Sequence, residues 1–220
     1  MPTSTKEDTM SKKIIITIAR QYGSGGREIG ERIAELLGIP LYDKQLITDA
    51  AAKGSLNEEV LRSADESAAN SLLYTLAMGS NHFGAAMHFG YKMPLNDKLF
   101  ILQSEIIKEK AKDESCVIIG RCADYVLRDE EMVLRIFVYG DLDHRQARIA
   151  ARHPELKSAQ VIDVINKTDK RRSSYYNFYT GNKWGKYDNY DMAINSSTLG
   201  IDGAAELIVS CAKKLLEENK

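Results

Sequence analysis

The chain contains only three cysteines, Cys116, Cys122 and Cys211, among its 220 residues. An odd, sparse set of cysteines without a CxxC pair argues against a disulfide framework and against a zinc site. We therefore expect buried thiols in a reducing compartment, and a cytoplasmic protein.

Long apolar runs are also missing from the sequence. No stretch approaches the roughly 18 residues that a membrane span needs. Residues 1–12 are polar and lack the apolar segment of a signal peptide, so we expect them to form a disordered leader.

Neither sign of charge is in excess. The chain has 30 lysines and arginines against 31 aspartates and glutamates, for a formal net charge of −1. No overall field attracts nucleic acid or an anionic membrane, and we expect neither as a partner. Any attraction for phosphate must therefore be local.

Five short apolar runs alternate with helical patterns along the chain. The first reads KIIITIA, which is β-branched and typical of a strand buried on both faces of a parallel sheet. The runs occupy residues 13–19, 39–42, 115–119, 133–139 and 192–195. The helical segments include residues 99–111, 141–152, 160–174 and 202–216, and the aromatic, glycine-rich residues 175–190 are predicted to form a loop. The pattern predicts an α/β fold with a five-stranded parallel sheet.

The first run leads directly into RQYGSGGREIG and then into an amphipathic helix. Such a strand–loop–helix unit directs unpaired backbone N–H groups and the positive end of the helix dipole at one point, where an anion can bind. Gly23, Ser24, Gly25 and Gly26 form the loop, and its glycines let the backbone approach phosphate closely. A plain glycine turn is the alternative.

Neither of the two familiar glycine motifs fits completely. In GxGxxG, the last glycine position is occupied by Glu28. In GxxxxGK[ST], with Gly25 as the second glycine, Arg20, Gly26 and Arg27 replace the first glycine, the lysine and the hydroxyl. The shape of the loop is retained but its side-chain chemistry is replaced, so Arg20 and Arg27 are the available cations.

Several segments resemble the cytidylate kinase-like family of P-loop proteins. The segment ITIARQYGSGGREIGERIAELLGIPLYDKQLI resembles the N-terminal part of these proteins, and VIIGRCADYVL resembles the segment that carries their GRD motif. Its lid and last strand and helix are similar to LRIFVYGDLDHRQARIAAR, TDKRR and YDMAINSSTLGIDGAAELI. The resemblance implies a P-loop NTPase-like three-layer α/β/α fold. Its core would be residues 13–54 and 98–220, with an arginine-rich lid at about 150–187 and a helical insertion, residues 55–97, covering the acceptor site.

The resemblance also implies ATP and Mg²⁺ as cofactors and phosphoryl transfer to a nucleotide such as CMP. The residues that it marks are Gly23, Ser24, Gly25 and Gly26 for the donor phosphates, Asp43, Arg121 and Asp124 for the acceptor, and Arg145, Arg148, Arg171 and Arg172 for the lid. Arg27 and Arg20 would serve in place of the missing lysine. Positioning and cations around the transferred oxygens are what phosphoryl transfer mainly requires.

The sequence departs from the family at defined positions. Cys122 replaces the aspartate of GRD, with Asp124 two residues further on. Ile119 stands where a metal-binding aspartate would precede Gly120, which leaves Glu28 as a candidate ligand for Mg²⁺.

Simpler roles remain open for these residues. Asp43 is also a candidate helix N-cap, Arg121 a salt-bridge partner, and the arginine-bearing helix a solvated charged face. The aromatic residues of 175–190 are suited to stacking a base, to packing a loop, or to a contact between copies in a homo-oligomer.

Three functions follow. The first is an ATP-dependent nucleotide kinase, favoured by Arg121 and the lid arginines. The second is a non-catalytic nucleotide-binding or regulatory protein, favoured by the missing lysine. The third is a kinase for a non-nucleotide acceptor, favoured by the altered GRD segment and the insertion.

Overall fold

The computed structural model describes residues 13–43 and 95–218 of the chain. Five strands form one sheet in the order β2-β3-β1-β4-β5, and all neighbouring pairs are parallel. Their bounds are β1 Ile15–Arg20, β2 Leu41–Tyr42, β3 Cys116–Ile119, β4 Val133–Tyr139 and β5 Met192–Asn195. The predicted α/β fold with a five-stranded parallel sheet is confirmed.

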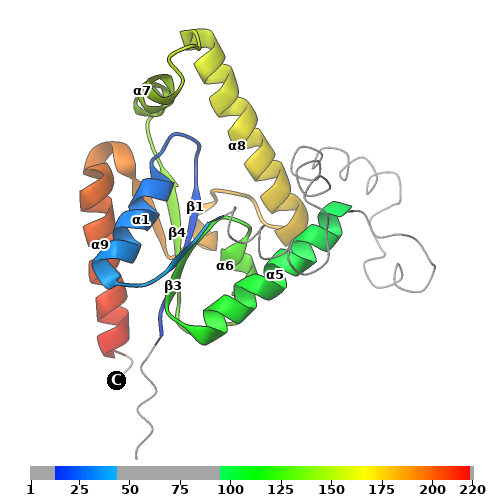
Figure 1. Cartoon of the computed structure of the whole chain (residues 1–220), viewed down its shortest axis with the longest axis vertical. Coiled ribbons are helices and arrows are strands. Elements are labelled where there is room, and N and C mark those ends of the chain that lie inside the picture. Colours follow the sequence, from blue (N-terminus) through cyan, green and yellow to red (C-terminus); the bar gives the residue numbers. More distant parts are fainter. Residues whose placement is uncertain (1–12, 44–94, 219–220) are drawn as a thin grey trace, which may run out of the picture.

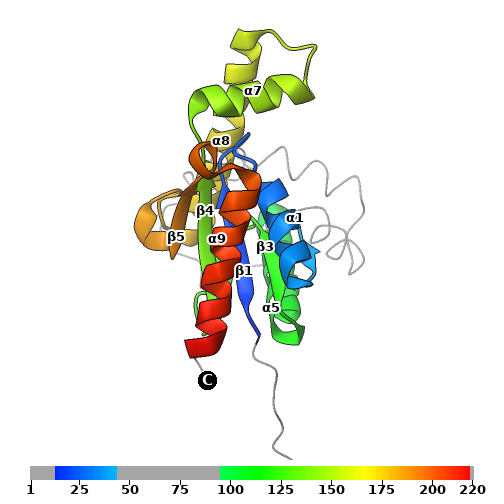
Figure 2. The ribbon, with the colours of Figure 1, turned by 90° about the vertical axis from the view of Figure 1, so that its left-hand side faces the viewer.

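Helices cover both faces of this sheet, as Figures 1 and 2 show. The helices are α1 Gly26–Leu37, α5 Leu95–Asp113, α6 Ala123–Val126, α7 Leu142–Arg152, α8 Ser158–Thr180 and α9 Ser196–Glu218. On one face α1 and α9 pack together, and α5 and α6 cover the other. The third pair, α7 and α8, extends beyond the end of the sheet at which β1 leads into the glycine loop.

The core lies in two layers because successive β-strand residues point to opposite faces. Ile16 and Ile18 of β1 pack with Ile29 of α1, while Ile15 packs on the opposite layer with Ile107 of α5. All five side chains are at most 4 % exposed. This two-sided burial explains why the strands read as continuous apolar runs.

Some boundaries differ from the sequence-based expectation. Residues 175–180 were predicted to be in a loop, and this was wrong, because α8 continues through them to Thr180 and ends where Gly181 takes a left-handed conformation. The last helix begins earlier than expected, at Ser196, with a non-helical break at Gly200. The first strand continues one residue further than predicted, to Arg20, which is therefore part of the sheet.

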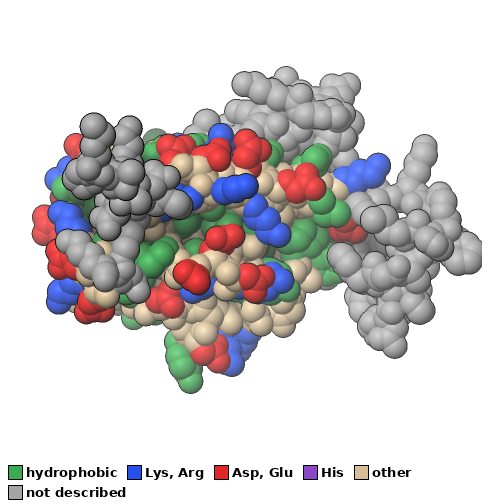
Figure 3. All heavy atoms as spheres, turned by 90° about the horizontal axis from the view of Figure 1, so that it is seen from below, with side chains coloured by type: hydrophobic (Ala, Val, Ile, Leu, Met, Phe, Trp, Pro, Cys, Tyr) green, Lys and Arg blue, Asp and Glu red, His purple; other side chains and the backbone are tan. Residues whose placement is uncertain are grey.

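The predicted leader, residues 44–54 and nearly all of the predicted insertion lie outside the described residues. None of the helices described in the structure is long and apolar enough to cross a membrane. All three cysteines are unpaired thiols, and Cys116 and Cys122 are buried, as expected. On the end of the molecule seen in Figure 3, basic and acidic side chains are interspersed over the described surface.

Candidate functional site

The glycine loop joins the end of β1 to the start of α1, at the carboxyl edge of the sheet. Gly23 and Gly25 have φ angles of 81° and 78°, a region that favours glycine. A Cβ on Gly23 would lie 2.9 Å from the carbonyl oxygen of Arg145, and one on Gly25 would lie 2.5 Å from Cδ1 of Ile201. The loop therefore packs too closely against its neighbours to carry side chains at these positions.

Gly25 is the N-cap residue of α1, and no side chain caps this helix end. The first N–H groups of the helix therefore face the loop without a capping side chain, which is the arrangement that binds phosphate at helix N-termini. Ser24 contributes differently, because its buried hydroxyl lies 2.9 Å from the carbonyl oxygen of Gln21 and 3.2 Å from that of Val138. These hydrogen bonds hold the loop against the end of β4, so Ser24 can contact a ligand only through its backbone.

The turn after β3 has an unusual backbone. Gly120, Arg121 and Cys122 have φ angles of 75°, 55° and 55°, so three successive residues are left-handed. Two of them are not glycine, and such strained conformations cluster at functional sites. Since β3 lies beside β1 in the sheet, the turn brings Arg121 next to the residues that follow β1.

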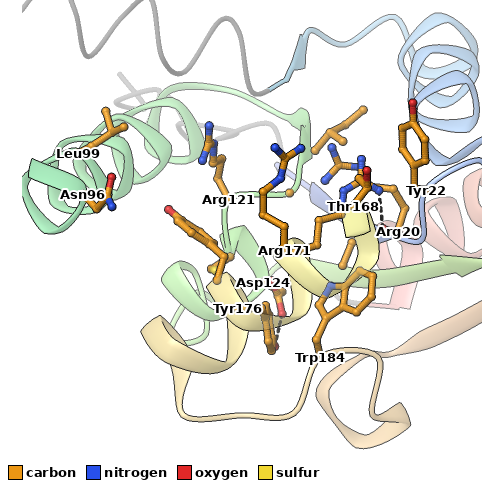
Figure 4. Close-up of a pocket in the computed structure, with 16 residues that line it drawn as sticks. Arg20, Tyr22, Asn96, Leu99, Arg121, Asp124, Thr168, Arg171, Tyr176 and Trp184 are labelled. Atoms are coloured by element: carbon orange, nitrogen blue, oxygen red, sulfur yellow. Dashed lines mark hydrogen bonds between the residues drawn. The ribbon is translucent and has the colours of Figure 1, made fainter. Parts of the chain in front are cut away.

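Two adjoining cavities lie at this edge of the sheet, with volumes of about 300 Å³ and about 330 Å³. We call them the arginine cavity and the loop cavity. The arginine cavity is lined by Arg20, Arg121, Arg171 and Arg172 together with Asp124, Tyr175, Tyr176 and Trp184. The loop cavity is lined by Gly23, Gly25, Gly26, Arg27, Glu28, Asp43 and Arg152 and shares Arg20, Tyr22, Ile119 and Arg172 with the first. Figure 4 shows Arg121 and Arg171 reaching in the same direction, away from Asp124.

The arginine cavity concentrates positive charge. Burial, followed by the guanidinium groups of Arg172 and Arg121, lowers the pKa of Arg20 to about 9. Burial also lowers the pKa of Arg172, and Arg171 adds to this effect. Cations that disfavour each other in this way provide a site for an anion with several oxygens.

The lid arginines fall into two groups. Arg171 and Arg172, on α8, line the arginine cavity. Arg145, on α7, lines neither cavity, and its buried Nη1 lies 2.6 Å from Asp169 and donates to the carbonyl oxygen of Tyr22. Arg148 pairs with Glu28 at 2.9 Å. The structure therefore brings only half of the four predicted lid arginines to a cavity.

Comparison with known proteins agrees with this geometry. The family model described as the cytidylate kinase-like family matches residues 15–198. The chain belongs to this family. A comparison with curated proteins found no match.

Three solved structures share the fold of this chain. A crystal structure of an uncharacterized protein from Eubacterium ventriosum is 28% identical, with a TM-score of 0.69, and the match covers 91% of this chain and 99% of that one. A shikimate kinase from Bacteroides thetaiotaomicron is 15% identical, with a TM-score of 0.51 and coverage of 93% and 98%. A gluconokinase from Sinorhizobium meliloti is 15% identical, with a TM-score of 0.51 and coverage of 94% and 97%. At this identity the last two show the fold alone.

Arg27 and Asp43, both predicted site residues, form an ion pair with each other. Arg27 lies 3.1 Å from Asp43 and 3.0 Å from Glu31, and its side chain is 64% exposed. Asp43 thus lies at the mouth of the loop cavity but is already held by the first turn of α1.

Glu28, the candidate Mg²⁺ ligand, lies between two arginines of α7. Its Oε1 accepts hydrogen bonds from Arg148 and Arg152. Within residues 13–43 and 95–218 there is no group of three side chains suited to hold a metal ion. In this structure Glu28 therefore links α7 to the first turn of α1.

Asp124 lies on α6 at the bottom of the arginine cavity and is 7% exposed. The hydroxyl of Tyr176 donates to its Oδ2 at 2.7 Å, as the dashed line in Figure 4 marks. Burial raises the pKa of Asp124, and this hydrogen bond opposes the rise. Cys122, at the position of the family's aspartate, is also buried, and its raised pKa keeps the thiol neutral.

We expect the variant Asp124→Asn to gain stability relative to the unaltered protein as pH rises from about 4. The raised pKa means that folded protein holds the proton more tightly than unfolded chain does. The unaltered protein therefore loses stability from the unfolded pKa up to the raised folded pKa, and asparagine does not share this loss. The measurement is the difference in Tm between the two proteins from pH 4 to pH 8. The exposed Asp129→Asn is the control, and a difference that is constant with pH would contradict the expectation.

Three residues around the site were not predicted from the sequence: Tyr22, Asp169 and Arg152. The backbone N–H of Tyr22 donates to Asp169 at 2.6 Å, so α8 is bonded directly to the glycine loop. The only indication in the sequence was that Asp169 is an acidic residue within the basic segment TDKRR, a position at which a carboxylate can pair with a cation. Trp184, the only tryptophan, also lines the arginine cavity and packs edge-on against Phe137.

Proposed function

We propose that this chain is an ATP-dependent kinase that transfers the γ-phosphoryl group to a nucleoside monophosphate such as CMP. The observation that carries the proposal is the pair of adjoining cavities, one built by the glycine loop and the other by arginines and aromatic rings. Phosphoryl transfer requires the donor and acceptor phosphates to lie next to each other and in line. The two cavities adjoin and share Arg20 and Arg172, so phosphates bound in them would be neighbours.

Each cavity has the chemistry for one substrate. The loop cavity offers backbone N–H groups at the start of α1 to the donor phosphates. The arginine cavity offers Arg121 and Arg171 to the acceptor phosphate, because a guanidinium binds two phosphate oxygens at once. Tyr175 and Trp184 add aromatic surface on which a base can stack.

Mg²⁺ would accompany ATP in this proposal. Proteins commonly hold this ion with one or two carboxylates together with the substrate phosphates. Glu28 and Asp43 are the carboxylates that line the described part of the loop cavity. Both are engaged by arginines in this structure, so they would serve the ion after those ion pairs open.

A non-catalytic nucleotide-binding role is the second candidate. The observation that favours it is the pairing of Arg148 with Glu28 and of Arg145 with Asp169, which removes two lid arginines from the cavities. Catalysis would then depend on Arg171 and Arg172 alone among the four.

The test is a phosphorylation assay with MgATP and CMP, dCMP, UMP, AMP and GMP as acceptors. Shikimate and gluconate are included because kinases named for them share the fold. Turnover of one nucleotide supports the proposal, and turnover only of an acid assigns the chain to a non-nucleotide acceptor. ATP binding, measured by calorimetry, without turnover of any acceptor would support the non-catalytic role.

A further inference from the structure

The glycine loop contains no lysine, so the cation that meets the transferred phosphoryl must come from elsewhere. Arg27 is the cation nearest in sequence to the position of the missing lysine. Its mostly exposed side chain forms ion pairs with Glu31 on α1 and with Asp43, just after β2. Arg27 lines the loop cavity but not the arginine cavity, so it does not lie where the two cavities meet. The inference below rests on the proposed function and identifies a different residue.

Arg20 is the last residue of β1, the central strand of the sheet. Its side chain lines both cavities, and so does that of Arg172. The carbonyl oxygen of Arg20 accepts a hydrogen bond from Nη1 of Arg172 at 3.0 Å, which fixes the two residues relative to each other. Among the described residues, no carboxylate forms an ion pair with the Arg20 guanidinium.

The backbone around Arg20 leaves room for its side chain. A Cβ on Gly26 would lie 2.6 Å from Cβ of Arg20, and a Cβ on Gly120 would overlap its Nη1. Two glycines, one in the loop and one after β3, therefore border the path of this side chain. The guanidinium is held against the left-handed turn at Gly120, next to Arg121.

Within residues 13–43 and 95–218 this cation has no ion-pair partner, and its surroundings disfavour its charge. Burial and the neighbouring guanidiniums of Arg172 and Arg121 lower its pKa, while Asp43 is too weak a counter-charge to reverse the effect. A multiply charged anion between the cavities would remove this penalty, because it would neutralise several guanidiniums at once.

We propose that Arg20 replaces the missing lysine and binds the oxygens of the transferred phosphoryl group where the two cavities meet. During transfer the bond from the γ-phosphorus to the oxygen bridging it to ADP breaks, and a bond to an acceptor oxygen forms. Arg20 keeps its protons throughout and stabilises the charge on the phosphoryl oxygens. A planar guanidinium suits this role because it contacts two oxygens together.

Binding of MgATP and of inorganic pyrophosphate, measured by calorimetry, tests this assignment without requiring turnover. We expect Arg20→Met to weaken both affinities roughly 10- to 150-fold, the size expected for losing a charged hydrogen bond. Arg20→Lys should retain most of the affinity. Arg27→Met should change it less than about threefold, the scale of a surface ion pair. The matched control is Arg32→Met, because the side chain of Arg32 pairs with Glu35 on α1 and with Asp202 on α9, outside both cavities.

A glycine pair provides a second test if Arg20→Met does not fold. Gly120→Ala places a Cβ on the Arg20 guanidinium, whereas Gly38→Ala meets nothing within 4 Å, and both residues have positive φ angles, of 75° and 64°. We expect weakened pyrophosphate binding in the first variant only.

The outcomes separate this inference from the proposed function. Unchanged affinity in Arg20→Met, or a larger loss in Arg27→Met, overturns the role of Arg20. Absence of pyrophosphate and ATP binding in the unaltered protein overturns it as well. Loss of binding in Arg20→Met, in a protein that phosphorylates no acceptor, supports phosphate binding by Arg20 but contradicts the kinase and, with it, a role of Arg20 in transfer.

Discussion

Replacing Arg121 with alanine should raise the KM for the acceptor roughly 100-fold and leave the KM for ATP within about threefold, if losing two charged hydrogen bonds costs about 3 kcal/mol. Arg121 follows β3, lines the arginine cavity and is absent from the loop cavity. Its effect should therefore be confined to the acceptor. The measurement is steady-state kinetics with each substrate varied in turn.

Arg128→Ala is the matched control for this variant. Arg128 lies just beyond α6, its side chain is 52% exposed, and it packs over the ring of Tyr125. We expect both KM values to remain unchanged in this control. Equal increases for ATP and acceptor in Arg121→Ala would show that Arg121 serves both substrates, and would contradict the division into two cavities.

Asp169→Ala should lower stability by about 3 kcal/mol, because it leaves the buried guanidinium of Arg145 without its partner. The side chains of Asp169 and Arg145 are only 18% and 10% exposed. Asp169 also accepts the backbone N–H of Tyr22, so the glycine loop loses a bond at the same time. For a chain of this size the expected decrease in Tm is roughly 6–12 °C, to be measured by calorimetry.

The control lies on the same helix. Asp163→Ala removes an exposed carboxylate that pairs with Lys167 one turn away, and should change Tm by less than about 2 °C. The double variant Arg145→Met with Asp169→Ala should be less destabilised than the sum of the two single changes, since no unpaired charge remains. Additive effects would contradict a buried ion pair.

The middle of the sheet was predictable because β1, β3 and β4 are largely buried on both faces. β4 and β5 occur at the predicted residues, because each is a short, mostly apolar run between polar segments. The position of the glycine loop was also predictable, because closely spaced glycines between a strand and an amphipathic helix are typical of a tight strand–loop–helix connection. In β2, Leu41 and Tyr42 alone pair, although residues 39–42 all look strand-like.

Long-range pairing set the limit of the sequence analysis. The sequence gives no indication that Glu28 joins Arg148, or that Arg145 turns to Asp169, because these partners lie far apart along the chain. The left-handed turn through Arg121 was equally hidden, since two of its three residues are not glycine. The continuation of α8 through Tyr176 was missed because aromatic residues have only middling helix propensity, and tertiary contacts override it.

The bond between Asp169 and Tyr22 has a thermodynamic consequence. It joins α8 to the backbone of the very loop that lines the second cavity, so the helix cannot move away from the loop while the bond persists. If a ligand binds the loop more tightly when α8 is in one position, then ligand binding stabilises that position of α8 by the same coupling free energy. Occupancy of the loop and the orientation of α8 are thus two measures of a single equilibrium.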